Sequence, residues 1–190
     1  MKTALLPVGL VALFCSLQTW TQTSAQTDVP VQPDFQPDRF QGKWYVVGLA
    51  LSSKPVKGGY FKMYSTTYQL LPDQSFNVTS ILLRGQRCDK WIRTFVPKDQ
   101  PGRFTLSNKG AHRVKDYTVS VMETNYEEYS IVHFRKDVAN KTFYKITLYG
   151  RTKELRSELK ERFVQVAEEQ GLRDDHVGFL PKIDECIDEN

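Results

Sequence analysis

Residues 39–50 read RFQGKWYVVGLA, and this stretch decides the fold. A short polar turn leads into Gly42-Lys43-Trp44, and an apolar, β-branched run follows. Gly42 allows close backbone approach, and Trp44 is a large apolar plug whose indole nitrogen needs a hydrogen-bond partner. Two later stretches, Thr124-Asn125-Tyr126 and Gly150-Arg151-Thr152, also stand at the ends of expected strands. We expect both to meet Trp44.

The rest of the chain consists of short runs that alternate apolar and polar residues, separated by turn residues. Eight consecutive runs with mostly short links are typical of an up-and-down antiparallel barrel rather than a parallel sheet. The expected strands cover residues 43–52, 60–71, 75–84, 88–97, 103–107, 115–123, 128–136 and 142–150. Before them, residues 26–38 carry three prolines and are expected to form an irregular lead-in.

After the last expected strand the hydrophobic period becomes helical, over Leu159, Phe163, Val166 and Ala167. This spacing predicts one C-terminal helix that begins within residues 153–157 and ends near Gly171. Its apolar stripe is interpreted as packing on the barrel wall rather than as a partner-binding face.

The ordered trio of Gly-x-Trp, Thr-[Asp/Asn]-Tyr and a late arginine resembles the three signature regions of the lipocalins. The resemblance implies an all-β, eight-stranded up-and-down antiparallel lipocalin barrel with one helix on its wall. It also implies that Arg151 lies across the ring of Trp44 and closes the bottom of the barrel. An eight-stranded barrel is just wide enough for one small ligand.

The N-terminus indicates export. Residues 1–25 combine Lys2, a mostly apolar run that is too short to span a membrane, and the small residues Thr23-Ser24-Ala25, which is typical of a cleaved signal peptide. The lipocalin domain is then expected over residues 26–190. Removal of residues 1–25, which hold one lysine and no acid, lowers the net charge from +4 to +3, a balance that does not suggest nucleic acid.

Two cysteines remain in the mature chain, Cys88 and Cys186. An even pair in an oxidising compartment predicts a disulfide between them. A free catalytic thiol is therefore not expected. The scattered histidines show no metal-ligand spacing, so no metal site is expected either.

The sequon Asn77-Val78-Thr79 sets the phase of the alternation. A glycosylated Asn77 must point outward, so its neighbours Phe76 and Val78 point inward, as does Ser80. The same alternation groups side chains on other strands into sets that share a face: Tyr64, Thr66 and Tyr68; Trp91, Arg93 and Phe95; Tyr117, Val119 and Val121; Val132, Phe134 and Lys136; Phe143, Lys145, Thr147 and Tyr149.

Three of these side chains are cations: Arg93, Lys136 and Lys145. Because alternate loops of an up-and-down barrel lie at the same end, all three are expected near one open mouth, opposite Trp44. The alternative is an inverted phase that leaves them in solvent. Cations inside a barrel repel one another and lose hydration, and no acid falls on these sets. We therefore expect an anionic ligand. The interleaved aromatic residues suit a polyanion with aromatic rings, such as a ferric catecholate complex.

Residues 42–50, 77–80, 91–97 and 145–155 extend the resemblance to lipocalins that bind ferric siderophores. It implies capture of an enterobactin-like ferric siderophore, with roles in iron transport and innate immunity. The siderophore would hold the iron, so neither a cofactor nor direct metal ligands are expected. The implied ligand-binding residues are Tyr64, Ser80, Trp91, Arg93, Tyr117, Phe134, Lys136, Phe143, Lys145 and Tyr149.

The chain departs from these lipocalins at four places. Phe143 stands where they carry tyrosine, which removes one hydroxyl donor. The loop at 108–114 is one residue shorter and lacks their usual Tyr-Pro. Asp99 replaces a cysteine that they can use for a disulfide to gelatinase, so gelatinase is not an expected partner. A second sequon, Asn140-Lys141-Thr142, lies at the expected mouth and is either glycosylated or unused.

The leading hypothesis is a secreted, non-enzymatic lipocalin that sequesters ferric catecholate siderophores. Secretory-granule storage and a cell-surface uptake receptor are candidate properties, whereas a membrane span is not expected. The second hypothesis is an extracellular carrier of a small hydrophobic ligand such as a fatty acid, retinoid or odorant. The third is a prostaglandin-isomerising lipocalin. That chemistry needs a free cysteine inside the barrel, and neither remaining cysteine is expected to be free.

Overall fold

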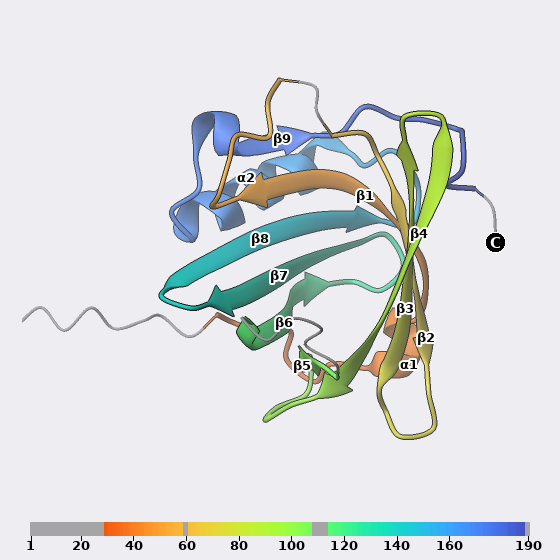
Figure 1. The fold of residues 1–190 in the computed structure, drawn as a ribbon, viewed down its shortest axis with the longest axis vertical. Coiled ribbons are helices and arrows are strands. Elements are labelled where there is room, and N and C mark those ends of the chain that lie inside the picture. The colour runs from red at the N-terminus through yellow and green to blue at the C-terminus, as the bar shows by residue number, and fades with distance from the viewer. Residues whose placement is uncertain (1–28, 59–60, 108–113, 189–190) are drawn as a thin grey trace, which may run out of the picture.

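The computed structural model describes residues 29–58, 61–107 and 114–188, and it forms a closed antiparallel barrel (Figure 1). The eight barrel strands are β1 (Gly42–Leu51), β2 (Ser65–Leu70), β3 (Phe76–Arg84), β4 (Arg87–Pro97), β5 (Arg103–Leu106), β6 (Val114–Thr124), β7 (Tyr129–Val138) and β8 (Lys141–Gly150). Each strand pairs with its neighbour in sequence, and β1 pairs with both β2 and β8, which closes the barrel. The predicted up-and-down barrel is therefore confirmed.

The alternation of side chains follows the predicted phase. Phe76, Val78 and Ser80 of β3 are almost fully buried, whereas Asn77 and Thr79 between them are partly exposed. The inner faces of the other strands contribute Trp44, Tyr68, Phe95, Val119, Phe134 and Tyr149 to the core. The interior is thus filled by large side chains at the bottom, and this filling leaves room for a ligand only toward the other end.

The bottom of the barrel is closed by Trp44 and Arg151. A short helix, α1 (Pro37–Phe40), precedes β1, and the carbonyl oxygen of Phe40 accepts a hydrogen bond of 2.9 Å from Nε1 of Trp44. The guanidinium carbon of Arg151 lies 3.6 Å from the centre of the Trp44 ring, as the resemblance implies. Arg151 also donates to the carbonyl oxygens of Lys43, Gln41 and Tyr126. One side chain therefore ties three separate segments together.

The helix α2 (Ser157–Glu169) follows the barrel as predicted. Its side chains Leu159, Phe163, Val166 and Ala167 are buried against the wall. The helix ends at Glu169, and Gly171 just after its C-cap has a φ of +80°, the left-handed conformation that glycine adopts readily. The predicted disulfide between Cys88 and Cys186 is present and holds the C-terminal segment against the start of β4.

The expectation differs from the structure at four elements. The second strand was expected from residue 60, but β2 begins at Ser65. The amide of Met63 instead donates to the carbonyl oxygen of Pro181 in the C-terminal segment. Residues 61–64 therefore alternate like a strand in sequence but lie outside the β2 pairing. The irregular lead-in was expected to run to residue 38, but Pro37 and Asp38 are the first residues of the helix α1. A 3₁₀ turn (Asp174–His176) and a short strand, β9 (Val177–Phe179), which pairs with the outer edge of β1, were not expected.

The ladder from β4 through β5 to β6 is short. β4 is 11 residues long, but only Phe95 to Pro97 pair with β5, and β5 pairs with β6 only through residues 103–105. The upper part of β4 therefore diverges from β6, as Figure 1 shows. In the part of the chain that the structure describes, no helix is long and apolar enough to cross a membrane.

Candidate ligand-binding site

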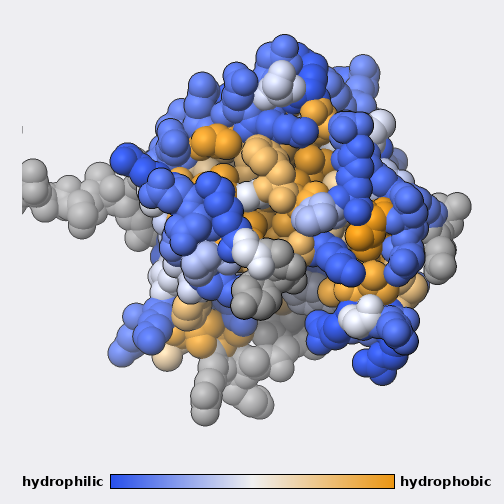
Figure 2. All heavy atoms as spheres, turned by 90° about the horizontal axis from the view of Figure 1, so that it is seen from above, coloured by the Kyte–Doolittle hydropathy of each residue, from blue (hydrophilic) through white to orange (hydrophobic). Residues whose placement is uncertain are grey.

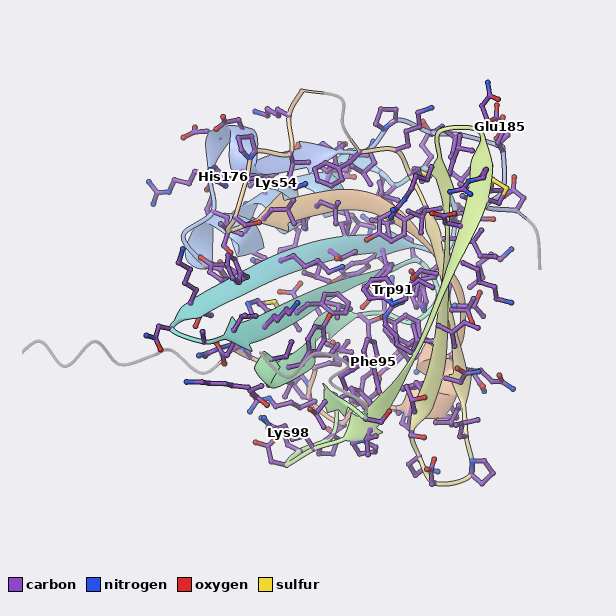
Figure 3. The ribbon with its side chains drawn as sticks, viewed as in Figure 1. Lys54, Trp91, Phe95, Lys98, His176 and Glu185 are labelled. Atoms are coloured by element: carbon purple, nitrogen blue, oxygen red, sulfur yellow. A yellow bond between two sulfur atoms is a disulfide. The ribbon has the colours of Figure 1, made fainter. Side chains whose placement is uncertain are left out.

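A large cavity opens at the end of the barrel opposite Trp44. Its larger part, which we call the aromatic lobe, has a volume of about 740 Å³. Its walls include Trp91, Arg93, Tyr117, Phe134, Lys136, Phe143 and Lys145. Figure 3 shows Trp91 and Phe95 extending from β4 into the barrel. All three predicted cations therefore line one cavity, and no carboxylate lies among the described residues of this lobe.

A second part of about 680 Å³, the aliphatic lobe, lies between the residue 61–64 segment and the β3–β4 hairpin. Its lining includes Leu49, Leu51, Phe61, Lys62, Tyr64, Ser80 and Leu82. Leu51, Trp91 and Lys145 line both lobes and form the ridge between them. Seen from above, apolar groups occupy the centre of the face and hydrophilic residues surround them (Figure 2). The site thus has two compartments that share Leu51, Trp91 and Lys145.

Arg93 is held in place by neighbours on β3 and β4. Its Nη1 donates a hydrogen bond of 3.0 Å to Oγ of Ser80, which lies one strand away. Its guanidinium carbon is 4.5 Å from the centre of the Trp91 ring and 5.3 Å from that of Phe95. A guanidinium between two rings is favoured by their π faces. This packing fixes the position of one positive charge at the cavity wall.

Lys145 projects inward from β8. Its Nζ lies 4.5 Å from the centre of the Phe134 ring. Burial, with a smaller contribution from the positive charge of Arg93, lowers the pKa of Lys145 from 10.5 to about 7. Because both causes disfavour the ammonium form, a nearby anion would restore it. An anionic ligand beside Lys145 would therefore stabilise its ammonium form.

Four tyrosine hydroxyls lie at the depth of the cavity and below it. Burial raises the pKa of Tyr64, Tyr117 and Tyr149 above its ordinary value, and raises that of Tyr68 to about 12. The hydroxyls of Tyr68 and Tyr149 are 3.2 Å apart and hydrogen-bonded. All four phenols stay protonated at neutral pH, so they offer hydrogen-bond donors rather than negative charge.

The predicted site residues do not all have equal access to a ligand. Trp91 is 54% exposed and Phe143 is 38% exposed, so both stand at the mouth. Lys136 lies exposed at the rim, whereas Arg93 and Lys145 are further inside. Tyr149 lines neither lobe, because it is fully buried beneath them. The predicted site residues therefore lie at different depths, from the rim of the cavity to the packed side chains below it.

The alternation rule missed several residues of the aromatic lobe. Ile92 and Thr94 belong to the other face of β4, yet both reach the cavity. Among the described residues, β4 and β6 diverge beyond the short β5 ladders, and this edge of β4 borders the cavity. Leu51 and Ser53, near the end of β1, also line the lobe. A wide gap between strands cannot be read from a period of two.

The remaining sequence features occupy the expected places. Asn77 is partly exposed on the outer face of β3, and Asn140 is exposed in the β7–β8 turn beside the mouth. Asp99 is exposed and pairs with Arg103 at the barrel's lower end. Most of the shortened 108–114 loop lies outside the described residues.

The closed eight-stranded barrel with one open mouth defines a protein that holds a small molecule inside its sheet. Residues 41–184 match the model of the lipocalin and cytosolic fatty-acid binding protein family. The chain therefore belongs to the lipocalin family, and it is a small-ligand-binding lipocalin.

The chain is 48% identical to neutrophil gelatinase-associated lipocalin of Mus musculus, in an alignment that covers 99% of this chain and 100% of that protein. It is 47% identical to the Homo sapiens protein of the same name over 96% of this chain and 100% of that one. Among solved structures, lipocalin 12 from rat epididymis superposes with a TM-score of 0.73 at 27% identity, covering 80% of this chain and 88% of that one.

Proposed function

We propose that this lipocalin is secreted and sequesters ferric catecholate siderophores in its aromatic lobe, which limits bacterial iron and carries iron between sites. One observation carries the proposal. Arg93, Lys136 and Lys145 line a single cavity with aromatic walls, and no described residue of that lobe is a carboxylate. The cost of holding these charges together is offset when a polyanion enters.

The shape of the ligand follows from the rings. Catecholates are flat and aromatic, and Trp91, Tyr117 and Phe134 present rings around the cations. A ferric tris-catecholate is a trianion, so each of three cations has a charge to meet. Among the four buried tyrosines, Tyr117 lines this lobe, and its neutral hydroxyl offers a hydrogen bond to a catecholate oxygen without adding repulsion. The likeness to neutrophil gelatinase-associated lipocalins supports the same interpretation.

A binding role rather than a catalytic one also belongs to this proposal. The chain is 37% identical to mouse prostaglandin-H2 D-isomerase. However, Cys88 and Cys186 form a disulfide on the outside of the barrel mouth, so neither offers a thiol nucleophile. Secretion is supported by the predicted leader at residues 1–25, which lies outside the described residues, and by the disulfide itself.

Tryptophan fluorescence tests the proposal, because Trp91 lines the cavity and Trp44 is sealed at the opposite end. Ferric enterobactin should quench the emission of Trp91, and the iron-free siderophore should bind less well because its catechols are largely protonated and splayed. Trp44→Phe is the matched control that should retain the quenching. Absence of quenching by ferric enterobactin, together with tight binding of retinol, would favour the carrier of a neutral hydrophobic ligand instead.

A further inference from the structure

The side-chain amine of Lys145 is not engaged by its neighbours on the adjacent strands. Lys145 pairs across the ladders with Phe134 on β7 and with Leu51 on β1, and neither of those side chains can accept a hydrogen bond. Among the described residues, Nζ of Lys145 has no hydrogen-bond or ion-pair partner, and it lies 4.5 Å from the centre of the Phe134 ring. Because Lys145 lines both lobes, this amine can meet a molecule that enters the cavity.

The charged groups around this amine are mostly positive. They are Arg93 and Lys136 in the aromatic lobe, and Lys62, Arg84 and Lys90 in the aliphatic lobe. Asp89 is the one acid of the described linings, and its carboxylate already pairs with Arg84 at 3.0 Å. Within the described part of the cavity, no carboxylate is therefore left to hold a proton on Lys145.

These surroundings make Lys145 a nucleophile at neutral pH. Desolvation and a neighbouring positive charge are the two conditions that leave a lysine unprotonated and reactive. Both are present here, and they lower the pKa of Lys145 to about 7. At pH 7.4 most of this amine is then neutral, compared with about 0.1% for an ordinary exposed lysine. Only the neutral amine has a lone pair with which to attack a carbonyl carbon.

The walls of the aromatic lobe determine which carbonyl compound fits. The rings of Trp91, Tyr117 and Phe134 offer flat apolar surface, which favours an aldehyde conjugated to an aromatic ring. An imine at Lys145 would leave the charge of Arg93 in the lobe, where the guanidinium is held in place by Ser80 and by the ring of Trp91. An anionic substituent on the aldehyde's ring would supply the negative charge that Arg93 favours.

We propose that Lys145 captures anionic aromatic aldehydes covalently, as a reversible imine. The lone pair of Nζ attacks the carbonyl carbon and forms the C–N bond, and the carbonyl oxygen takes up a proton that the nitrogen releases. The resulting carbinolamine loses its hydroxyl group and the remaining N–H proton as water, which leaves a C=N bond. The net step joins one amine to one aldehyde, releases one water and needs no oxidant or reductant. This activity goes beyond the siderophore binding proposed above and does not depend on it.

Reductive trapping tests the proposal. One equivalent of 4-formylbenzoate, with sodium cyanoborohydride to reduce the imine to a stable secondary amine, should add one label per chain at pH 7.4. Peptide mass mapping should locate this label on Lys145, at a rate at least about tenfold above that of any other lysine. Neutral benzaldehyde should label Lys145 roughly twofold to fivefold more slowly, as expected for the loss of one charge contact at an open site.

Lys145→Met should lose the fast label. Lys98→Met, which removes an exposed lysine outside the cavity, is the matched control and should keep it. Arg93→Gln should still be labelled at Lys145, but without the preference for 4-formylbenzoate over benzaldehyde. Circular dichroism checks that each variant is folded, and the mapping on the wild type needs no variant.

Three results would overturn the proposal: label spread evenly over the exposed lysines of the wild type, a fast label that survives Lys145→Met, or benzaldehyde as reactive as 4-formylbenzoate. Saturation with ferric enterobactin should slow the labelling of Lys145, because both molecules occupy the aromatic lobe. Fast labelling of Lys145 that ferric enterobactin does not slow would support the imine chemistry and refute only the function proposed for this lobe.

Discussion

Replacing Lys145 with methionine tests the contribution of the cation in the aromatic lobe whose charged form is disfavoured by burial. Methionine keeps much of the length and apolar packing against Phe134, but it removes the ammonium group. Loss of a charged hydrogen bond typically costs about 1.5–3 kcal/mol. We therefore expect the variant to bind ferric enterobactin roughly tenfold to a hundredfold more weakly at pH 7, while a neutral apolar probe binds as well as before or better.

The pH dependence gives the sharper readout. In the empty protein the pKa of Lys145 is about 7, because of burial and then Arg93. A bound trianion favours the ammonium form and raises this pKa, so binding takes up a proton when the pH is above 7. Affinity of the wild type should therefore fall by up to about tenfold for each unit between pH 7.5 and pH 9. Lys145→Met should be nearly flat over this interval, and Lys136→Met, the rim control, should keep the slope.

In the empty protein, the lowered pKa of Lys145 predicts that stability rises with pH, whereas ligand affinity falls with pH. Its pKa is lower in the folded state than in the unfolded state, so between pH 7 and pH 10.5 the unfolded chain binds more protons. This difference makes the free energy of unfolding rise with pH in that window. Urea unfolding of wild type and Lys145→Met should therefore differ most at pH 7, where the variant is the more stable. A variant with unchanged ferric affinity, or a wild type whose affinity ignores pH, would refute the assignment of Lys145 to the site.

Three further predictions concern stability. Arg151→Ala should lower the free energy of unfolding by about 2–4 kcal/mol, because it removes the stack on Trp44 and several hydrogen bonds; thermal denaturation measures this, and an affinity loss at normal stability would contradict it. Serine at both Cys88 and Cys186 should cost about 4–5 kcal/mol in the chain-entropy model, measured by urea unfolding, and a loss near zero would count against that model here. Burial, and then Arg135, lowers the pKa of His133 to about 4, so the fold should lose about 3 kcal/mol as the pH falls from 6.5 to 4. His133→Phe should flatten that acid limb, and a limb as steep as that of wild type would assign it to other groups.

The barrel could be predicted from the sequence because its evidence is local. Alternation located the strands, and the sequon at Asn77 set which face is inside; Phe76 and Val78 are buried accordingly. The start of β2 was wrong because the residue 61–64 segment alternates like a strand, whereas its backbone bonds reach the C-terminal segment. β9 has only three residues, too few for a period to show.

The site could be predicted less completely. Arg93 and Lys145 lie in the cavity as predicted. They could be predicted because a charged residue that shares a strand face with aromatic residues stands out in the sequence. Leu49 and Leu82 carried none, because a leucine that lines a cavity and a leucine in a packed core look alike in sequence. The depth of Tyr149 below the cavity likewise depends on how the side chains above it pack, which no single strand determines.

The disulfide also orders events during biosynthesis. Cys88 precedes Cys186 by 98 residues, and β8, the last barrel strand, ends at Gly150. Every barrel strand has therefore been synthesised before the second cysteine of the bond is available. Strand pairing can therefore begin before the crosslink is able to form. The bond thus joins the start of β4 to a C-terminal segment that is synthesised after the whole barrel.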